Sequence, residues 1–157
     1  MPLEPGQKAP NFKLLNDKEE PITLKNFAGK NLIIYFYPKD NTPGCTIESR
    51  GFSKLANKFK KLNTEILGVS KDSIASHKKF KEKYKFPFDL LSDPEGIMCK
   101  AYGAWGEKSL FGKKYLGIIR STFLINTQGN IINSWYKVKV KSHASAVLEK
   151  LTNSQKS

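Results

Sequence analysis

The most apolar segment of the chain is residues 31–37, in which six hydrophobic side chains follow one another before Pro38. A continuous apolar run of this length is typical of a strand that is buried on both faces. Residues 64–70 form a second run of the same kind. Between the two runs, apolar residues recur at helical spacing, which predicts a helix from Pro43-Gly44 to about Leu62. A strand, a helix and a strand in this order predict a parallel pair joined by a right-handed crossover.

Shorter elements are predicted on both sides of this unit. Asp93 is expected to cap one of the helices, with Pro94 in its first turn. The order of elements predicts an α/β fold, with helices flanking a central mixed β-sheet, as one domain over residues 1–157. The expected strands are 11–15, 20–24, 88–91, 121–125 and 131–140, the expected turn between the last two is 127–130, and the further helices are 73–84, 95–102 and 142–151.

Composition narrows the class of protein. Hydrophobic residues make up 39% of the 157 residues and aromatic residues 11%, which is enough for a sizeable core and excludes a disordered tail. The longest apolar run is far shorter than the ~20 residues that cross a bilayer. Two prolines and a glutamate fall within the first five residues, and the first twelve contain no apolar stretch, so they do not resemble a secretory signal. We therefore expect a soluble, cytoplasmic protein.

The net charge of +13 makes nucleic-acid binding the competing function from another class. All but two of the 27 basic residues are lysines, and the lysines gather on what read as solvated faces. Those at 78–85 surround a helix whose core face holds Phe80 and Tyr84, and those at 137, 139 and 141 alternate with valines, as in a half-buried strand. We expect non-specific affinity for nucleic acid at low salt, and no dedicated nucleic-acid function.

Candidate chemistry lies just beyond the first buried strand, because α/β sheets place functional groups at the carboxyl ends of their strands. Cys45 begins the predicted helix there, where free backbone N–H groups and the helix dipole favour a thiolate. Thr42 could hold a small polar oxidant against the sulfur, and Gly44 lets the backbone approach closely. The residues alone leave open whether Cys45 is a reactive thiol or a buried structural one.

The same segment resembles a known family. Pro38, Thr42 and Cys45 match the Pro-x-x-x-Thr-x-x-Cys motif of the peroxiredoxins, and Arg120 in GIIRSTFLIN matches their second active-site element. With SDPEG and AYGAWGEK, these motifs resemble the peroxiredoxin Q branch, also called bacterioferritin comigratory protein, from about Leu3 to Leu151. The resemblance implies a thioredoxin-like fold with an N-terminal β-hairpin extension, thiol peroxidase activity on hydrogen peroxide and alkyl hydroperoxides, and no cofactor.

The resemblance also implies roles for these residues. Cys45 would be the peroxidatic thiolate that becomes a sulfenic acid. Arg120 would stabilise the thiolate and the departing oxygen, while the Thr42 hydroxyl and the Cys45 N–H would donate hydrogen bonds to the peroxide. Pro38 would shield the sulfur from bulk water. Glu48, three residues after Cys45, could orient Arg120 or could be an ordinary solvated helix charge.

Two positions bear on how the sulfenic acid is resolved. Many members of the branch carry a resolving cysteine where this chain has Arg50, which we expect to be a surface charge. Others place it in a later helix, which matches Cys99. We expect Cys99 to form an intramolecular disulfide with Cys45 after local unfolding of both segments, with thioredoxin or a similar dithiol as reductant. The alternative is a structural Cys99 in a one-cysteine enzyme reduced by an external thiol. Family resemblance alone favours a monomer.

Other chemistry finds little support in the sequence. His77 and His143 are far from both cysteines along the chain, so we expect surface histidines and no metal site. No glycine-rich phosphate loop is present, which argues against nucleotide binding. A Cys-x-x-Cys pair is also missing, which argues against an oxidoreductase that acts on protein disulfides.

Overall fold

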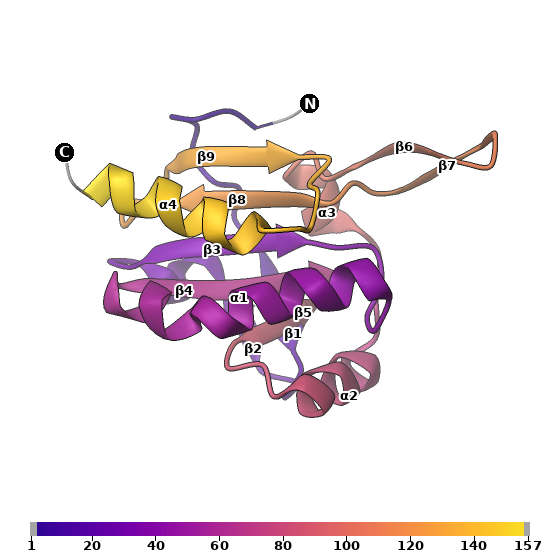
Figure 1. Ribbon diagram of the computed structural model, residues 1–157, viewed down its shortest axis with the longest axis horizontal. Coiled ribbons are helices and arrows are strands. Elements are labelled where there is room, and N and C mark those ends of the chain that lie inside the picture. The colour runs from indigo at the N-terminus through magenta and orange to yellow at the C-terminus, as the bar shows by residue number, and fades with distance from the viewer. Residues whose placement is uncertain (1–2, 156–157) are drawn as a thin grey trace.

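A computed structural model describes residues 3–155, so positions 1–2 and 156–157 of the expected domain lie outside the described residues. Seven strands form one mixed sheet in the order β2-β1-β5-β4-β3-β8-β9, and two further strands, β6 and β7, form a separate hairpin (Figure 1). The strands are β1 Lys13–Asn16, β2 Pro21–Thr23, β3 Asn31–Phe36, β4 Thr64–Ser70, β5 Asp89–Ser92, β6 Trp105–Leu110, β7 Lys113–Ile118, β8 Ser121–Ile125 and β9 Ile131–Tyr136. The helices are η1 Leu24–Phe27, α1 Pro43–Lys61, α2 Ile74–Tyr84, α3 Ile97–Ala101 and α4 His143–Gln155.

The centre of the sheet is the predicted parallel pair. β3 runs parallel to β4 and antiparallel to β8, and all six residues of β3 are buried. Because side chains alternate along a strand, β3 supplies both hydrophobic cores of the protein. Ile33 and Tyr35 point into the core beneath α1, α2 and α4, while Ile34 and Phe36 point into the core on the opposite face. This second core is closed by α3 and by segments near the N-terminus.

Most predicted elements are present, including the N-terminal hairpin, whose strands β1 and β2 pair antiparallel. Two boundaries were wrong. The helix expected at 95–102 begins only at Ile97, where Gly96 in a left-handed conformation is the N-cap, so Pro94 is outside the helix. Asp93 nevertheless accepts a hydrogen bond from the Cys99 N–H at 2.9 Å.

The strand expected at 131–140 ends at Tyr136. Lys137 takes a positive φ of 54°, which breaks the extended backbone. The three lysines at 137, 139 and 141 are exposed as predicted, but they lie in a loop rather than on a strand. The β6–β7 hairpin was not predicted at all. No helix among residues 3–155 is long and apolar enough to cross a bilayer.

Candidate active site

Cys45 is the third residue of α1, and its side chain is only 1% exposed. The helix begins with Thr42 as its N-cap and Pro43 as its first residue, a favourable start because proline has no N–H to leave unpaired. The first helical hydrogen bond runs from the Thr46 N–H to the Thr42 carbonyl at 2.8 Å. The N–H groups of Gly44 and Cys45 precede that bond and therefore point out of the helix end beside the sulfur.

Arg120 joins Cys45 to Glu48, although it lies far from both along the chain. Its Nη2 donates to the Cys45 Sγ at 3.3 Å, and its Nη1 donates to Glu48 Oε1 at 2.7 Å. The expected pairing of Glu48 with Arg120 is confirmed as a contact, and the alternative of a solvated Glu48 is wrong, because its side chain is fully buried. The planar guanidinium thus uses separate nitrogens for the carboxylate and the sulfur, which a lysine could not do.

Glu48 is an unusual carboxyl group. Burial raises its pKa to about 7 even though Arg120 acts in the opposite direction. Its second oxygen, Oε2, has no hydrogen-bond partner among the described side chains and backbone. Glu48 also lines a cavity of about 440 Å³ between α1 and the start of α4. The carboxyl group therefore titrates close to neutral pH, within hydrogen-bonding distance of the guanidinium that contacts the sulfur.

The remaining predicted site residues surround this contact. Pro38 is half-buried, two residues after the end of β3. The Thr42 hydroxyl donates its proton to the Lys39 carbonyl at 2.9 Å, so in this structure it offers acceptor lone pairs, rather than the expected donor, to a ligand. A Cβ at Gly44 would lie 3.3 Å from the Arg120 Nη2, so the absence of a side chain there leaves room for the guanidinium.

Cys99 lies in α3 and is fully buried. Burial and the neighbouring Asp93 carboxylate raise the pKa of its thiol strongly. Both cysteines are free in this structure. Cys45 belongs to the core beneath α1 and Cys99 to the core on the opposite face of the sheet, so the structure does not bring the two expected redox partners together.

The expectation of surface histidines was wrong for both residues. His143 is buried and its Nε2 lies 2.8 Å from the Thr122 hydroxyl; burial and Arg120 lower its pKa to about 4. His77 is fully buried between the Asp40 carboxylate, at 2.7 Å, and the Leu91 carbonyl, at 2.8 Å. Their burial depends on partners from distant segments, which no local pattern reveals.

A cluster of hydrogen-bonded side chains that supports the active-site loop was also not predicted from the sequence. Asp40, in that loop, accepts hydrogen bonds from Tyr37 and Ser76 as well as contacting His77, and its own N–H donates to Asp72. Oxygen and nitrogen atoms of Asp40, Asp72 and His77 lie within 4.8 Å of one another, but these side chains are engaged in hydrogen bonds within the protein. The cluster therefore fixes the loop that carries Pro38 and Thr42 against α2.

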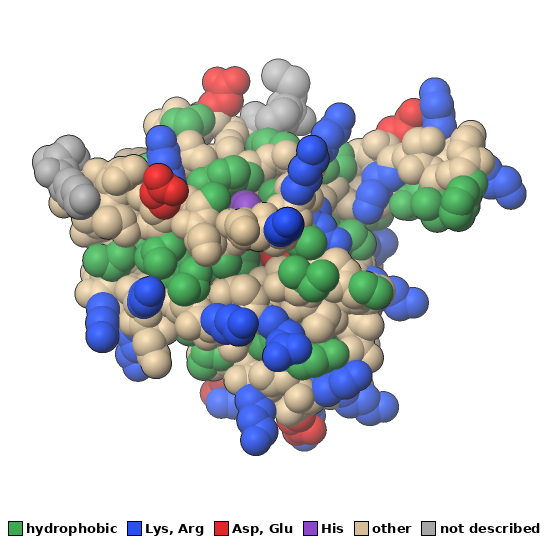
Figure 2. Space-filling model, viewed as in Figure 1, with side chains coloured by type: hydrophobic (Ala, Val, Ile, Leu, Met, Phe, Trp, Pro, Cys, Tyr) green, Lys and Arg blue, Asp and Glu red, His purple; other side chains and the backbone are tan. Residues whose placement is uncertain are grey.

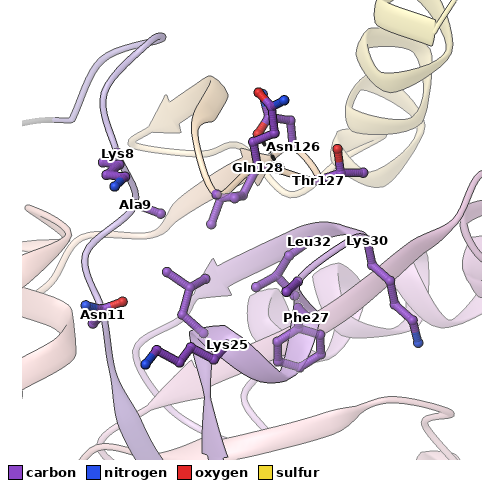
Figure 3. A pocket seen from close by; sticks show the side chains of 14 residues that line it. Lys8, Ala9, Asn11, Lys25, Phe27, Lys30, Leu32, Asn126, Thr127 and Gln128 are labelled. Atoms are coloured by element: carbon purple, nitrogen blue, oxygen red, sulfur yellow. Dashed lines mark hydrogen bonds between the residues drawn. The ribbon is translucent and has the colours of Figure 1, made fainter.

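Other features lie apart from this site. Arg50 is exposed as predicted, and its guanidinium lies 5.6 Å from the ring centre of Tyr84. A cavity of about 250 Å³, lined by Phe27, Leu32 and several lysines, opens at the amino end of β3 (Figure 3). Cys45 follows the carboxyl end of β3, so this cavity is at the other end of the sheet.

Comparison with known proteins identifies the family. The family model described as AhpC/TSA matches residues 5–134. Peroxiredoxin Bcp of Bacillus subtilis is 48% identical over 151 residues, covering 96% of each chain. The chain is a peroxiredoxin of the AhpC/TSA family. Within that family it belongs to the peroxiredoxin Q branch that the motifs indicated, and it is a peroxidase.

Solved structures of the branch have the same fold. A cysteine-to-serine mutant of Xylella fastidiosa PrxQ has a TM-score of 0.93 at 38% identity, covering 99% of both chains. A cysteine-to-serine mutant of Xanthomonas campestris Peroxiredoxin Q has a TM-score of 0.87 at 45% identity, covering 91% of both chains. The thioredoxin-like fold expected for this peroxiredoxin is therefore confirmed. Peroxiredoxins act on a peroxide and require a reductant.

Proposed function

We propose that Cys45 is the peroxidatic residue of this peroxiredoxin. Its thiolate attacks one oxygen of the peroxide and the O–O bond breaks. Cys45 becomes a sulfenic acid, and the second oxygen takes up a proton and leaves as water or an alcohol. The observation that carries this proposal is the 3.3 Å contact between Arg120 Nη2 and Cys45 Sγ, because it places a fixed cation on the atom that must bear the negative charge.

Arg120 would stabilise charge before and during the reaction. Its guanidinium is already oriented by Glu48, so it does not have to reorganise when charge shifts from the sulfur to the departing oxygen. Glu48 gains and loses a proton near pH 7, and this changes how strongly Arg120 stabilises negative charge at the sulfur. Only the ionised carboxylate partly neutralises the positive charge of Arg120. Glu48 would therefore act as a positioning residue and not touch the peroxide.

Thr42 and the amino-terminal end of α1 would orient the peroxide. The backbone N–H of Cys45 can donate to a peroxide oxygen, and the Thr42 hydroxyl, whose proton points to Lys39, can accept the peroxide O–H. A donor and an acceptor on the two sides fit the hydroperoxide group, which itself has one O–H. Pro38 would shield the sulfur from bulk water, and Gly44 would make room for Arg120.

Cys99 would resolve the sulfenic acid. Its sulfur attacks the Cys45 sulfur, and the sulfenic oxygen leaves as water with the Cys99 proton, which gives an intramolecular disulfide. Because the two residues lie in different cores, both segments must first unfold locally. α3 has only five residues, and Pro43 and Gly44 begin α1, so we expect the free energy of this local unfolding to be small. Burial keeps Cys99 protonated until it opens.

A dithiol protein such as thioredoxin would then reduce the disulfide. The alternative is a one-cysteine cycle in which an external thiol reduces Cys45 directly and Cys99 is structural. We further propose that residues 1–157 act as one domain, as a monomer in the cytoplasm, with no cofactor and no dedicated nucleic-acid partner.

Thiol counting by mass spectrometry tests the cycle. Wild type treated with one equivalent of hydrogen peroxide should lose both free thiols and show a peptide that links Cys45 to Cys99. Cys99→Ser should instead hold a sulfenic acid on Cys45, detected by dimedone. If wild type keeps one free thiol while the other carries a stable sulfenic acid, the intramolecular route is wrong.

A further inference from the structure

The β6–β7 hairpin forms an arm that projects from the body of the protein (Figure 1). The arm carries Phe111, the most exposed of the large apolar side chains among residues 3–155. In the turn at its end Phe111 is 96% exposed, and Leu110 beside it is 56% exposed; Leu116, midway along β7, is 66% exposed. Figure 2 shows this apolar tip standing clear of the main body with basic side chains beside it. Exposed apolar groups gathered in this way mark a surface that meets a partner.

The backbone at the tip supports a role for Phe111 beyond folding. Leu110 pairs with Lys113, so the turn has two central residues, Phe111 and Gly112, with φ values of 51° and 80°. Two-residue turns with positive φ at both positions prefer Asn-Gly, and a bulky aromatic residue at the first position is conformationally costly. The chain therefore has Phe111 where Asn would build the same turn at lower cost.

The root of the arm adjoins the active site. Arg120 follows β7 by two residues, and the Ile119 N–H donates to the Ala104 carbonyl at 2.8 Å, which closes the base of the hairpin. Lys108 in β6 interacts electrostatically with the same site. Burial and Arg120 lower the pKa of Lys108, while Cys45 acts to raise it. A molecule bound along the arm would thus be held next to Cys45.

Exposed apolar residues outside the arm also flank the two cysteines. Ile47, 56% exposed, is two residues after Cys45, and Ile97, 65% exposed, is two residues before Cys99. A partner that contacts these side chains and the arm would cover both redox segments. A protein that must reach the disulfide between them has to do this, whereas a small peroxide does not.

Charge indicates what kind of protein fits. The tip is flanked by the exposed Lys113 and Lys114, and the whole chain carries +13. Two copies of this chain would repel each other, which argues against self-association through the arm. An apolar patch with an acidic rim is the complementary surface.

We propose that the β6–β7 arm is the docking element for the dithiol protein that reduces this enzyme, a thioredoxin-type protein with an apolar, acid-rimmed surface around its thiols. This inference rests on the proposed Cys45–Cys99 cycle. Held by the arm, one thiolate of the reductant attacks a sulfur of the disulfide and forms a mixed disulfide. Its second thiol then displaces the enzyme, so the reductant leaves oxidised and both cysteines are returned as thiols.

The decisive variant is Phe111→Asn, because Asn suits the turn and removes only the apolar tip. Peroxidase turnover is measured with thioredoxin, thioredoxin reductase and NADPH, and separately with dithiothreitol, which needs no docking surface. We expect the KM for thioredoxin to rise about tenfold, with kcat at saturation and dithiothreitol-driven turnover unchanged. Leu15→Ser is the matched control, since Leu15 is a 41% exposed leucine on β1 and outside the arm; its KM should stay at the wild-type value.

Several outcomes would overturn the docking role. These are an unchanged KM in Phe111→Asn and in the double variant Phe111→Asn/Leu116→Ser, an equal rise in Leu15→Ser, or a wild type that dithiothreitol reduces and thioredoxin does not. The arm would be a membrane element instead if Phe111→Asn, with dithiothreitol as reductant, reduced a lipid hydroperoxide in anionic vesicles more slowly than wild type while its KM for thioredoxin stayed unchanged. Failure of the proposed cycle is distinguishable, because wild type would then form no Cys45–Cys99 disulfide.

Discussion

Cys45 and Cys99 lie on opposite faces of the central sheet. Cys45 packs in the core that contains Ile33 and Tyr35, and Cys99 packs in the core that contains Ile34 and Phe36. Each cysteine is almost completely buried. In the proposed cycle the reduced enzyme thus protects both sulfurs, and forming the disulfide must remove both from their cores.

Oxidation should therefore loosen two defined segments. We expect faster amide hydrogen exchange in the disulfide form at the start of α1 and in α3, because each must leave its packed position, while β3 and β4 stay protected. Exchange measured by mass spectrometry on reduced and oxidised wild type checks this. Identical exchange at residues 43–50 and 95–102 in the two forms would contradict it, and oxidised Cys99→Ser is the control without a disulfide.

Replacing Arg120 by lysine should slow the reaction with peroxide. A lysine has one nitrogen and cannot contact Glu48 and Cys45 in the present geometry, so charge stabilisation at the sulfur is lost. We expect Arg120→Lys to reduce the second-order rate constant for Cys45 oxidation by about a hundredfold to a thousandfold, measured by stopped flow. The matched control is Arg50→Lys, at the exposed arginine, which should react at the wild-type rate.

Stability should depend on pH through Glu48. Burial raises its pKa from 4.5 to about 7, so the folded protein favours the neutral carboxyl group. This contribution is complete below the unfolded pKa and is lost as pH rises through about 7. Glu48→Gln does not titrate and should gain stability relative to wild type between about pH 5 and pH 8, by at most about 3 kcal/mol. Urea unfolding at both pH values measures this; a constant difference between the proteins would refute it.

Adding one methyl group at Gly44 should disturb the site without unfolding the protein. The new Cβ would lie 3.3 Å from the Arg120 Nη2, which pushes the guanidinium away from the sulfur. We expect Gly44→Ala to lower the rate of Cys45 oxidation roughly tenfold. Gly51→Ala in the same helix is the control, because its Cβ would meet only the Ala144 side chain at an ordinary 3.4 Å. Equal rates in the two variants would contradict the close-approach argument.

The sequence predicted the parts of the fold that depend on periodicity. The apolar runs at β3 and β4 and the helical spacing in α1 were sufficient, because burial on one or two faces leaves a direct pattern. The β6–β7 arm was missed because both of its faces are largely exposed, so hydrophobic residues do not alternate there, and its Phe-Gly turn lacks the usual Asn. Gly112 was the one local signal of a turn.

The site was predictable to the extent that it lies at the end of one strand. Thr42, Cys45 and Glu48 fall on one loop and one helix, and Arg120 was singled out by the family motif. His77 and His143 could not be placed, because their burial comes from Asp40, Leu91 and Thr122 on other elements. Asn41, in the active-site loop, takes a positive φ of 58°. Its identity in the sequence did not indicate the hydrogen-bonded cluster that supports this loop.

The central claim is that the Cys45 sulfur is the nucleophile that attacks the peroxide and that Cys99 is only its resolving partner. Single-turnover peroxide reduction tests this claim most directly. Reduced wild type, Cys45→Ser and Cys99→Ser are each mixed with excess hydrogen peroxide without a reductant, and the first equivalent consumed is followed by stopped flow. The account predicts that Cys99→Ser consumes its first equivalent at the wild-type rate and that Cys45→Ser consumes none in that phase. A Cys45→Ser protein that reduces one equivalent at the wild-type rate would contradict it.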